Sequence, residues 1–90
     1  MSTAHRTVII ANQRGLHARA ASKIATLASK FQADITVSKG AQTVSGCSIM
    51  GLMMLAAGIG SKIELSARGL DADAALNAIC KLINERFQED

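Results

Sequence analysis

The chain has 90 residues, of which 49% are hydrophobic, 19% charged and 2% aromatic, and its formal net charge is +3. This length predicts one domain, residues 1–90, with one hydrophobic core. The low content of aromatic side chains disfavours binding to nucleic acids by stacking on their bases. The sequence shows neither an apolar run of about 18 residues nor a secretory signal, so we expect a cytoplasmic protein that does not insert into membranes.

The first half of the chain predicts a strand, a helix and a hairpin. The run RTVIIA, residues 6–11, is rich in β-branched residues and ends at the polar NQRG, which indicates a strand and a loop. The segments ADITVSKG and AQTVSG predict two short strands that turn at Lys39-Gly40. Between them, apolar residues at three- and four-residue steps predict an amphipathic helix: Ala20, Ile24, Leu27, Ala28 and Phe31.

The second half predicts a short helix, a strand and a long helix. Ser48 stands in the N-cap position of the apolar helix 48–56, and SKIELSA alternates as a half-buried strand does. In the closing segment Asp71 is the expected N-cap. The stripe of this last helix consists of Leu76, Ile79, Cys80, Ile83 and Phe87.

The order of these elements is β-α-β-β-α-β-α. Because the strands alternate and the helices are apolar on one side, we expect an α+β fold, an open-faced β-sandwich. It consists of a four-stranded antiparallel sheet with three helices on one face and water on the other.

The two cysteines and His5 suggest no chemistry. Cys47 and Cys80 form no C-x-x-C pair and have no histidine at zinc-ligand spacing, so we expect free, mostly buried thiols and no metal site. His5 is expected to be a surface residue at the end of a strand.

His17 follows the loop and stands at the start of the first helix. Free backbone N–H groups and the helix dipole make such a place an anion site, and Arg14 and Arg19 add positive charge. A neutral imidazole there can accept a phosphoryl group covalently. The alternative, from this spacing alone, is an ordinary solvated histidine.

Three segments resemble one known family. GLHARAA resembles the active-site segment of HPr, the histidine-containing phosphocarrier of bacterial phosphotransferase systems. SIMGLMML is similar to the second signature of the family and AALNAI to its last helix. The resemblance runs from Arg6 to Phe87 and agrees with the predicted order of elements.

The resemblance implies a phosphocarrier that has no turnover of its own and needs no cofactor. Enzyme I, charged from phosphoenolpyruvate, would phosphorylate His17, which would pass the group to an enzyme IIA. Arg19 would steady the phosphate, with the amides of Ala18 and Arg19 as donors, and the carrier would act as a monomer. In many members a dedicated HPr serine kinase/phosphorylase modifies the residue that matches Ser48.

One position departs from the family pattern H-A-R-P-A, because Ala20 stands where proline is usual. Proline in the first turn fixes φ and omits an N–H that has no intrahelical partner, so alanine loses preorganisation. We expect a working but looser site.

The short helix predicts a docking surface. Ile49, Met50 and Met53 project to one side and Leu52 and Leu55 to the other, and only one side can face the core. The alternative is that all five are core residues. The family suggests that the first three are exposed beside His17 and dock partners, together with Ala20 and Lys23.

Two other functions stay open. The chain could be a regulatory module that binds through Ile49, Met50 and Met53, with phosphorylation only tuning affinity. A small nucleic-acid-binding domain ranks last, because Phe31 and Phe87 fit helical stripes. The sequence does not distinguish the sugar-uptake from the nitrogen-related branch.

Overall fold

The structure, a computed structural model, describes residues 2–89. The expected hairpin and the order of strands and helices are confirmed, and a 3₁₀ turn, η1, is added near the end of the chain. In chain order the elements are β1 (Ser2–Ile9), α1 (Ala18–Ala28), β2 (Ala33–Lys39), β3 (Gln42–Ser45), α2 (Ile49–Met54), β4 (Lys62–Gly69), α3 (Ala72–Asn84) and η1 (Arg86–Gln88).

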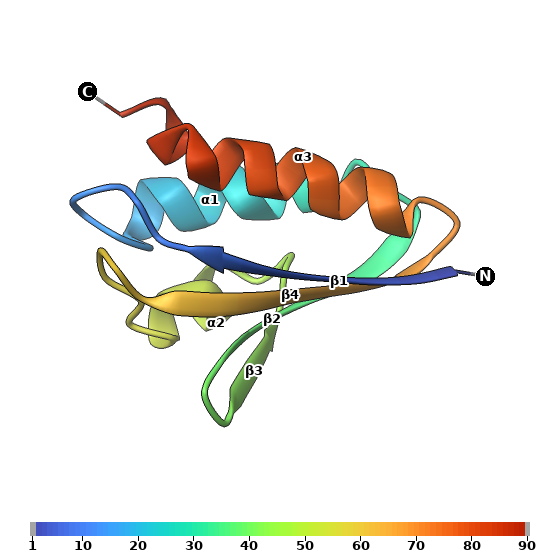
Figure 1. The fold of residues 1–90 in the computed structure, drawn as a ribbon, viewed down its shortest axis with the longest axis horizontal. Helices are drawn as coiled ribbons and strands as arrows, with labels where there is room; N and C mark the ends of the chain where they lie inside the picture. Colours follow the sequence, from blue (N-terminus) through green and yellow to red (C-terminus); the bar gives the residue numbers. More distant parts are fainter. Residues whose placement is uncertain (1, 90) are drawn as a thin grey trace.

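The four strands form one antiparallel sheet in the order β1-β4-β2-β3 (Figure 1). β4 lies in the middle: it pairs with β1 from Ser2 opposite Gly69 to Ile9 opposite Lys62, and with β2 on its other side. The first strand of the chain thus pairs with the last, which places the loop after β1 beside the segment that leads into β4.

The helices cover one face of this sheet, as expected. In β4, Ile63, Leu65 and Ala67 are buried while Lys62 and Glu64 on the alternate face are exposed. α1 and α3 lie side by side along the same side of the sheet (Figure 1), and α2 packs against α1 and β3. The fold is therefore the open-faced α+β sandwich.

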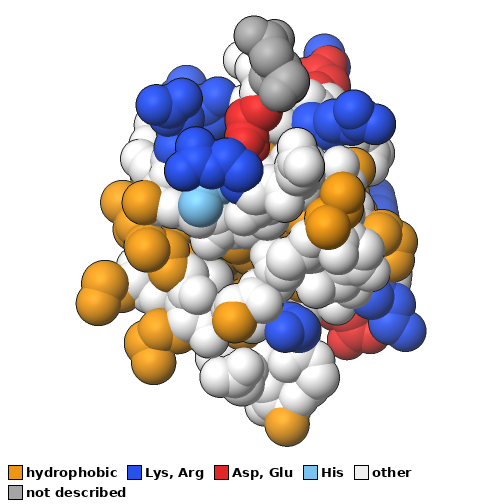
Figure 2. Space-filling view, turned by 90° about the vertical axis from the view of Figure 1, so that its left-hand side faces the viewer, with side chains coloured by type: hydrophobic (Ala, Val, Ile, Leu, Met, Phe, Trp, Pro, Cys, Tyr) orange, Lys and Arg blue, Asp and Glu red, His pale blue; other side chains and the backbone are white. Residues whose placement is uncertain are grey.

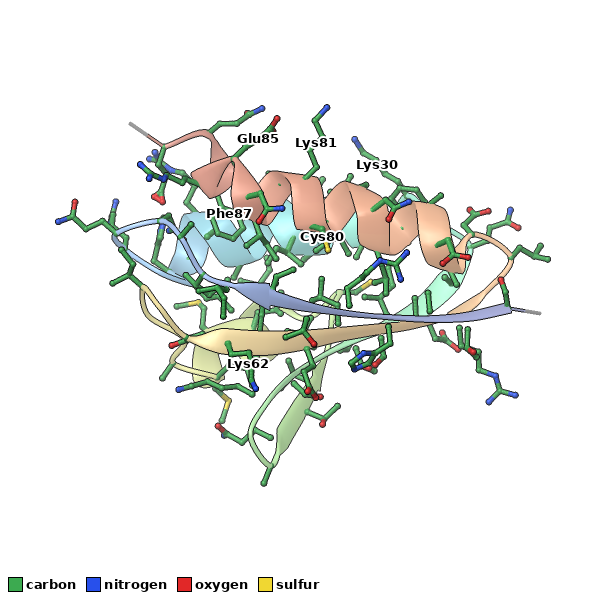
Figure 3. All side chains as sticks on the ribbon, in the orientation of Figure 1. Lys30, Lys62, Cys80, Lys81, Glu85 and Phe87 are labelled. Carbon is green, nitrogen blue, oxygen red and sulfur yellow. The ribbon has the colours of Figure 1, made fainter. Side chains whose placement is uncertain are left out.

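The core lies between the sheet and the helices and reaches the end of the chain. Ile24 of α1 and Ile79 and Ile83 of α3 are fully buried. Phe87 of η1 is also fully buried, and its ring points toward the sheet below the end of α3 (Figure 3). Phe87 is also tied to α1, because Lys23 donates to its carbonyl.

Several element boundaries differ from expectation. β1 begins at Ser2, four residues before the expected start, because its edge pairs with the whole of β4. His5 therefore lies within a strand, opposite Ser66, and not at its end. Phe31 lies beyond α1, and Phe87 lies in η1 and not in α3. Asp71 is the N-cap residue of α3, yet its carboxylate accepts from the N–H of Gln32 at 2.9 Å instead of capping the helix.

The thiols are free, but the prediction that they are buried is wrong for Cys47, which is exposed. Cys80 is half-buried; burial raises the pKa of its thiol, and the charge of Arg6 partly offsets this. Within residues 2–89, no helix is long and apolar enough to cross a bilayer, and no group of three metal-ligating side chains gathers.

Candidate site at the start of helix α1

The loop before His17 is fixed by its backbone. The N–H of Gly15 donates to the carbonyl of Asn12 at 3.2 Å, and Gly15 has a φ of +67°, which suits glycine. The N–H of Leu16 donates to the carbonyl of Ala57 at 2.9 Å. This last bond ties the loop to the segment that follows α2, so the two motifs found in the sequence lie next to each other.

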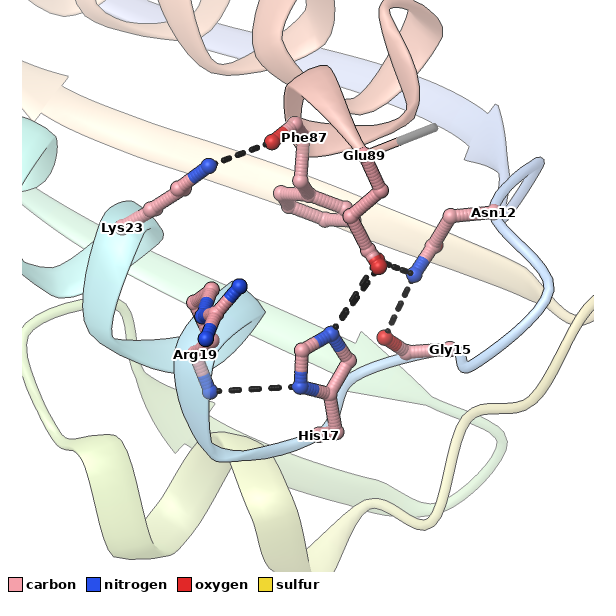
Figure 4. Close-up of polar contacts among 7 residues, drawn as sticks. All are labelled: Asn12, Gly15, His17, Arg19, Lys23, Phe87 and Glu89. Carbon is pink, nitrogen blue, oxygen red and sulfur yellow. Dashed lines mark hydrogen bonds and ion pairs between the residues drawn. The ribbon is translucent and has the colours of Figure 1, made fainter.

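His17 is itself the N-cap of α1. Its backbone is extended, with φ −75° and ψ 177°, and its Nδ1 accepts from the N–H of Arg19 at 3.3 Å (Figure 4). The first intrahelical bond runs from Ala21 N to His17 O, so the N–H groups of Ala18, Arg19 and Ala20 precede it. A backbone N–H can donate only to a nitrogen that carries a lone pair, so Nδ1 is unprotonated.

The other ring nitrogen faces a carboxylate. His17 Nε2 lies 3.1 Å from both carboxylate oxygens of Glu89, and the two side chains are only 16% and 17% exposed (Figure 4). Nε2 therefore carries the proton, and its N–H donates a hydrogen bond to the carboxylate of Glu89. Together the two contacts define one tautomer, with a proton on Nε2 and a lone pair on Nδ1.

A buried amide holds the carboxylate in place. The Nδ2 of Asn12 donates to Glu89 Oε1 and to the carbonyl of Gly15, both at 2.8 Å, and Asn12 is 1% exposed. The hydrogen bond from His17 lowers the pKa of Glu89 most, and burial opposes this; the bond from Asn12 and the charge of Arg14 lower it further. Glu89 is thus a carboxylate at neutral pH.

Cationic side chains surround this carboxylate. Arg14, Arg19 and Lys23 line a small polar pocket together with Gln88 and Glu89. Lys23 donates from Nζ to the carbonyl of Phe87, so its ammonium joins α1 to η1 (Figure 4). The prediction that Ala20 docks partners is wrong for its side chain, which is fully buried and cannot contact another protein.

α2 presents an apolar surface, as expected. Ile49, Met50 and Met53 are 42%, 71% and 39% exposed, whereas Leu52 and Leu55 are buried. Figure 2 shows hydrophobic side chains gathered on one side of the molecule, below a cluster of Lys and Arg side chains and a histidine. We call Ile49, Met50 and Met53 the α2 patch.

Ser48 occupies the N-cap position expected for it. Its Oγ accepts from the N–H of Gly51 at 2.9 Å and so caps α2. The hydroxyl is half-buried next to Ile49 of the α2 patch.

The sequence pattern does not identify two residues of this site. Asn12 belongs to the polar NQRG loop, and Glu89 lies 72 residues from His17 in the sequence. No periodicity signals either contact.

Comparisons with known proteins show which family the chain is similar to. The family model described as "PTS HPr component phosphorylation site" matches residues 4–85. The phosphocarrier protein NPr of Shewanella violacea is 51% identical over 89 residues, which cover 99% of this chain and 98% of the relative. The phosphocarrier protein HPr of Cupriavidus necator is 45% identical over 84 residues, covering 93% and 94%.

A solved structure shares the fold. The crystal structure of HPr-C-His from Thermoanaerobacter tengcongensis superposes with a TM-score of 0.92 at 40% identity, covering 97% of this chain and 98% of that one. Family, relatives and fold agree over nearly the whole length. The chain belongs to the HPr family, the phosphocarrier proteins of the phosphotransferase system, which have no turnover of their own.

Proposed function

We propose that His17 carries the phosphoryl group, which it takes from enzyme I, charged from phosphoenolpyruvate, and gives to an enzyme IIA. The observation that supports this is the lone pair of Nδ1, which lies at the N-terminus of α1 in contact with a backbone N–H. A nucleophile needs such a lone pair, and the positive end of a helix favours the phosphoryl anion.

The transfer is a substitution at phosphorus. Nδ1 of His17 attacks, a new N–P bond forms, and the bond between phosphorus and the donor breaks with its electron pair leaving on the donor. The proton on Nε2 remains where it is. Onward transfer to enzyme IIA runs the same way, with Nδ1 as the leaving group.

The surroundings of Nδ1 suit the incoming group. As the lone pair becomes a bond to phosphorus, the N–H of Arg19 loses its acceptor and can donate to a phosphoryl oxygen instead. The N–H of Ala18 and the guanidinium of Arg19 are further donors at the same helix start. Arg19 thus serves twice, through its backbone and its side chain.

The partners dock beside His17, on the α2 patch and on the basic side chains of α1.

We assign the carrier to the nitrogen-related branch, because its 51% identical relative is named NPr, whereas the HPr relative is 45% identical. We further propose that it works as a cytoplasmic monomer, with Ser48 as a site of regulatory phosphorylation by a dedicated kinase. A purely regulatory module is not favoured.

Intact-mass spectrometry tests the carrier role. The chain is incubated with Mg²⁺, phosphoenolpyruvate and either a sugar-branch or a nitrogen-related enzyme I. We expect one added phosphate that is lost in brief acid, formed faster with the nitrogen-related enzyme, and absent from His17→Ala. An equal phosphate on His17→Ala would contradict the role of His17, and a faster sugar-branch reaction would contradict the branch.

A further inference from the structure

We propose that Glu89 is a positioning residue for His17: its carboxylate fixes the ring and tautomer that leave Nδ1 free to attack, and it stabilises the ring once phosphorylated. This inference rests on the proposed carrier function of His17 and adds to it a residue from the other end of the chain. It is argued from the contacts of Glu89, from its charge and from the backbone that places it.

The two hydrogen bonds of the ring work together. Glu89 accepts from Nε2 with both oxygens at 3.1 Å, and the N–H of Arg19 reaches Nδ1 on the same ring. If Nδ1 carried the proton, both contacts would be lost at once, because an N–H would face an N–H and a lone pair would face a carboxylate. Glu89 therefore selects the tautomer whose lone pair points to the helix start.

The charge of Glu89 matters most after transfer. With the Nε2 proton retained, a ring that binds phosphorus through Nδ1 becomes a cation. A carboxylate in contact with Nε2 stabilises that cation, as the aspartate of a serine-protease triad does for its histidine. Arg14, Arg19 and Lys23 border the Glu89 pocket, the charge of Arg14 favours the anion, and Asn12 holds one of its oxygens.

The backbone before Glu89 is strained in a way that serves this contact. Arg86, Phe87 and Gln88 have φ values of 57°, 56° and 59°, a left-handed run that non-glycine residues rarely adopt. The buried ring of Phe87 and the bond from Lys23 hold the run in place. The turn carries the chain back over the start of α1, so that Glu89 meets His17 (Figure 4). Strain of this kind often marks a functional constraint.

Three variants test the role of Glu89. Glu89→Ala removes acceptor and charge, Glu89→Gln keeps an acceptor without charge, and Glu85→Gln is the matched control for the loss of one negative charge. Glu85 is exposed, and within residues 2–89 its side chain forms no hydrogen bond or ion pair. The first readout is the rate of phosphate gain from enzyme I.

We expect Glu89→Ala to slow that rate by about 10- to 100-fold, as loss of an orienting partner does elsewhere. Glu89→Gln should be slowed less, and Glu85→Gln should match the unaltered chain. The second readout is the ¹⁵N NMR spectrum of the His17 imidazole without phosphate. The unaltered chain should show a proton on Nε2 and none on Nδ1, and Glu89→Ala a mixture of tautomers.

Each outcome supports or contradicts the positioning role of Glu89 or the carrier function of His17. Slower transfer with a mixed tautomer supports the positioning role. An unchanged rate overturns it, and so does an unchanged tautomer, since a slower rate alone would then reflect docking. If the unaltered chain takes no phosphate, the proposed carrier function is wrong. The NMR measurement still shows whether Glu89 fixes the tautomer of the His17 ring.

Discussion

At the scale of single residues, Gly15 sets the course of the loop that bears His17. Its φ is +67°, and a Cβ there would overlap the carbonyl oxygen of Ala57, the acceptor of the Leu16 bond. Gly15→Ala should lower the free energy of unfolding by about 1–3 kcal/mol, because strain adds to overpacking. Urea unfolding measures this.

The control for Gly15 is Gly58→Ala. Gly58 has open space where a Cβ would stand and no positive φ, so alanine there should leave stability unchanged or raise it slightly. Equal effects at both glycines would show that the loop tolerates a side chain and that the contact with Ala57 is not restrictive.

Ala20 tests the departure from the family pattern. Its N–H lies before the first intrahelical bond, so proline would sacrifice no helix hydrogen bond and would restrict the unfolded chain. Ala20→Pro should raise the melting temperature by about 2–6 °C, the equivalent of about 0.4–1 kcal/mol in a domain of this size. Calorimetry measures it.

The matched control is Ala21→Pro, one residue later, which removes the bond from Ala21 N to His17 O and should destabilise the chain. Ala20 is fully buried. A melting temperature of Ala20→Pro that is unchanged or lower would therefore mean that the core has no room for the ring, and the preorganisation argument would fail.

At the scale of elements, α2 has one buried side, which packs in the core, and one exposed side, for which we propose docking. Met50 is 71% exposed, so Met50→Glu should leave the melting temperature unchanged but slow phosphate transfer from enzyme I by about tenfold or more, because a charge would enter an apolar contact. Leu70→Glu is the control: Leu70 is 73% exposed but follows β4, at the end of the sheet away from the start of α1 (Figure 1). Equal slowing in both would remove the α2 patch as the docking surface.

Ser48 caps α2, and it is also the residue for which we propose regulatory phosphorylation. Ser48→Asp keeps an acceptor for the N–H of Gly51 and so should preserve stability, whereas Ser48→Ala should cost about 1 kcal/mol. The charge of Ser48→Asp beside the α2 patch should slow phosphorylation of His17 by enzyme I, as measured by intact mass. A Ser48→Asp chain that accepts phosphate at the normal rate would contradict the regulatory role.

Sequence periodicity predicted these elements well and the site only in part. Alternation in β4 and the opposed sides of α2 follow from local geometry, so the half-buried pattern of β4 and the buried side of α2, with Leu52, are predicted correctly. The contact between His17 and Glu89 depends on three left-handed residues that cost about 1–2 kcal/mol each in isolation. The packing of Phe87 and the bond from Lys23 help to hold that turn, and no local sequence pattern encodes either contact.

At the scale of the whole molecule, the net charge of +3 and the basic side chains around Glu89 should steer acidic partners. Raising NaCl from about 0.05 to 0.5 M should slow association with enzyme I by about tenfold, since the Debye length shrinks several-fold. Stopped-flow kinetics measures this. Arg14→Gln should weaken the dependence of the association rate on salt. The control is Lys81→Gln, which should not weaken it, because Lys81 is exposed on α3 (Figure 3). An association rate that does not change with salt would refute steering.

The pairing of the first strand with the last has a consequence for how the protein is made. β1 finds its partner only when residues 62–69 exist, and His17 gains its carboxylate only when residue 89 exists. Contacts so distant in sequence form late, because closing a long loop precedes any gain. A nascent chain on the ribosome therefore holds its histidine without a site around it, and we expect the phosphate transfer proposed for His17 to become possible only with the last step of folding.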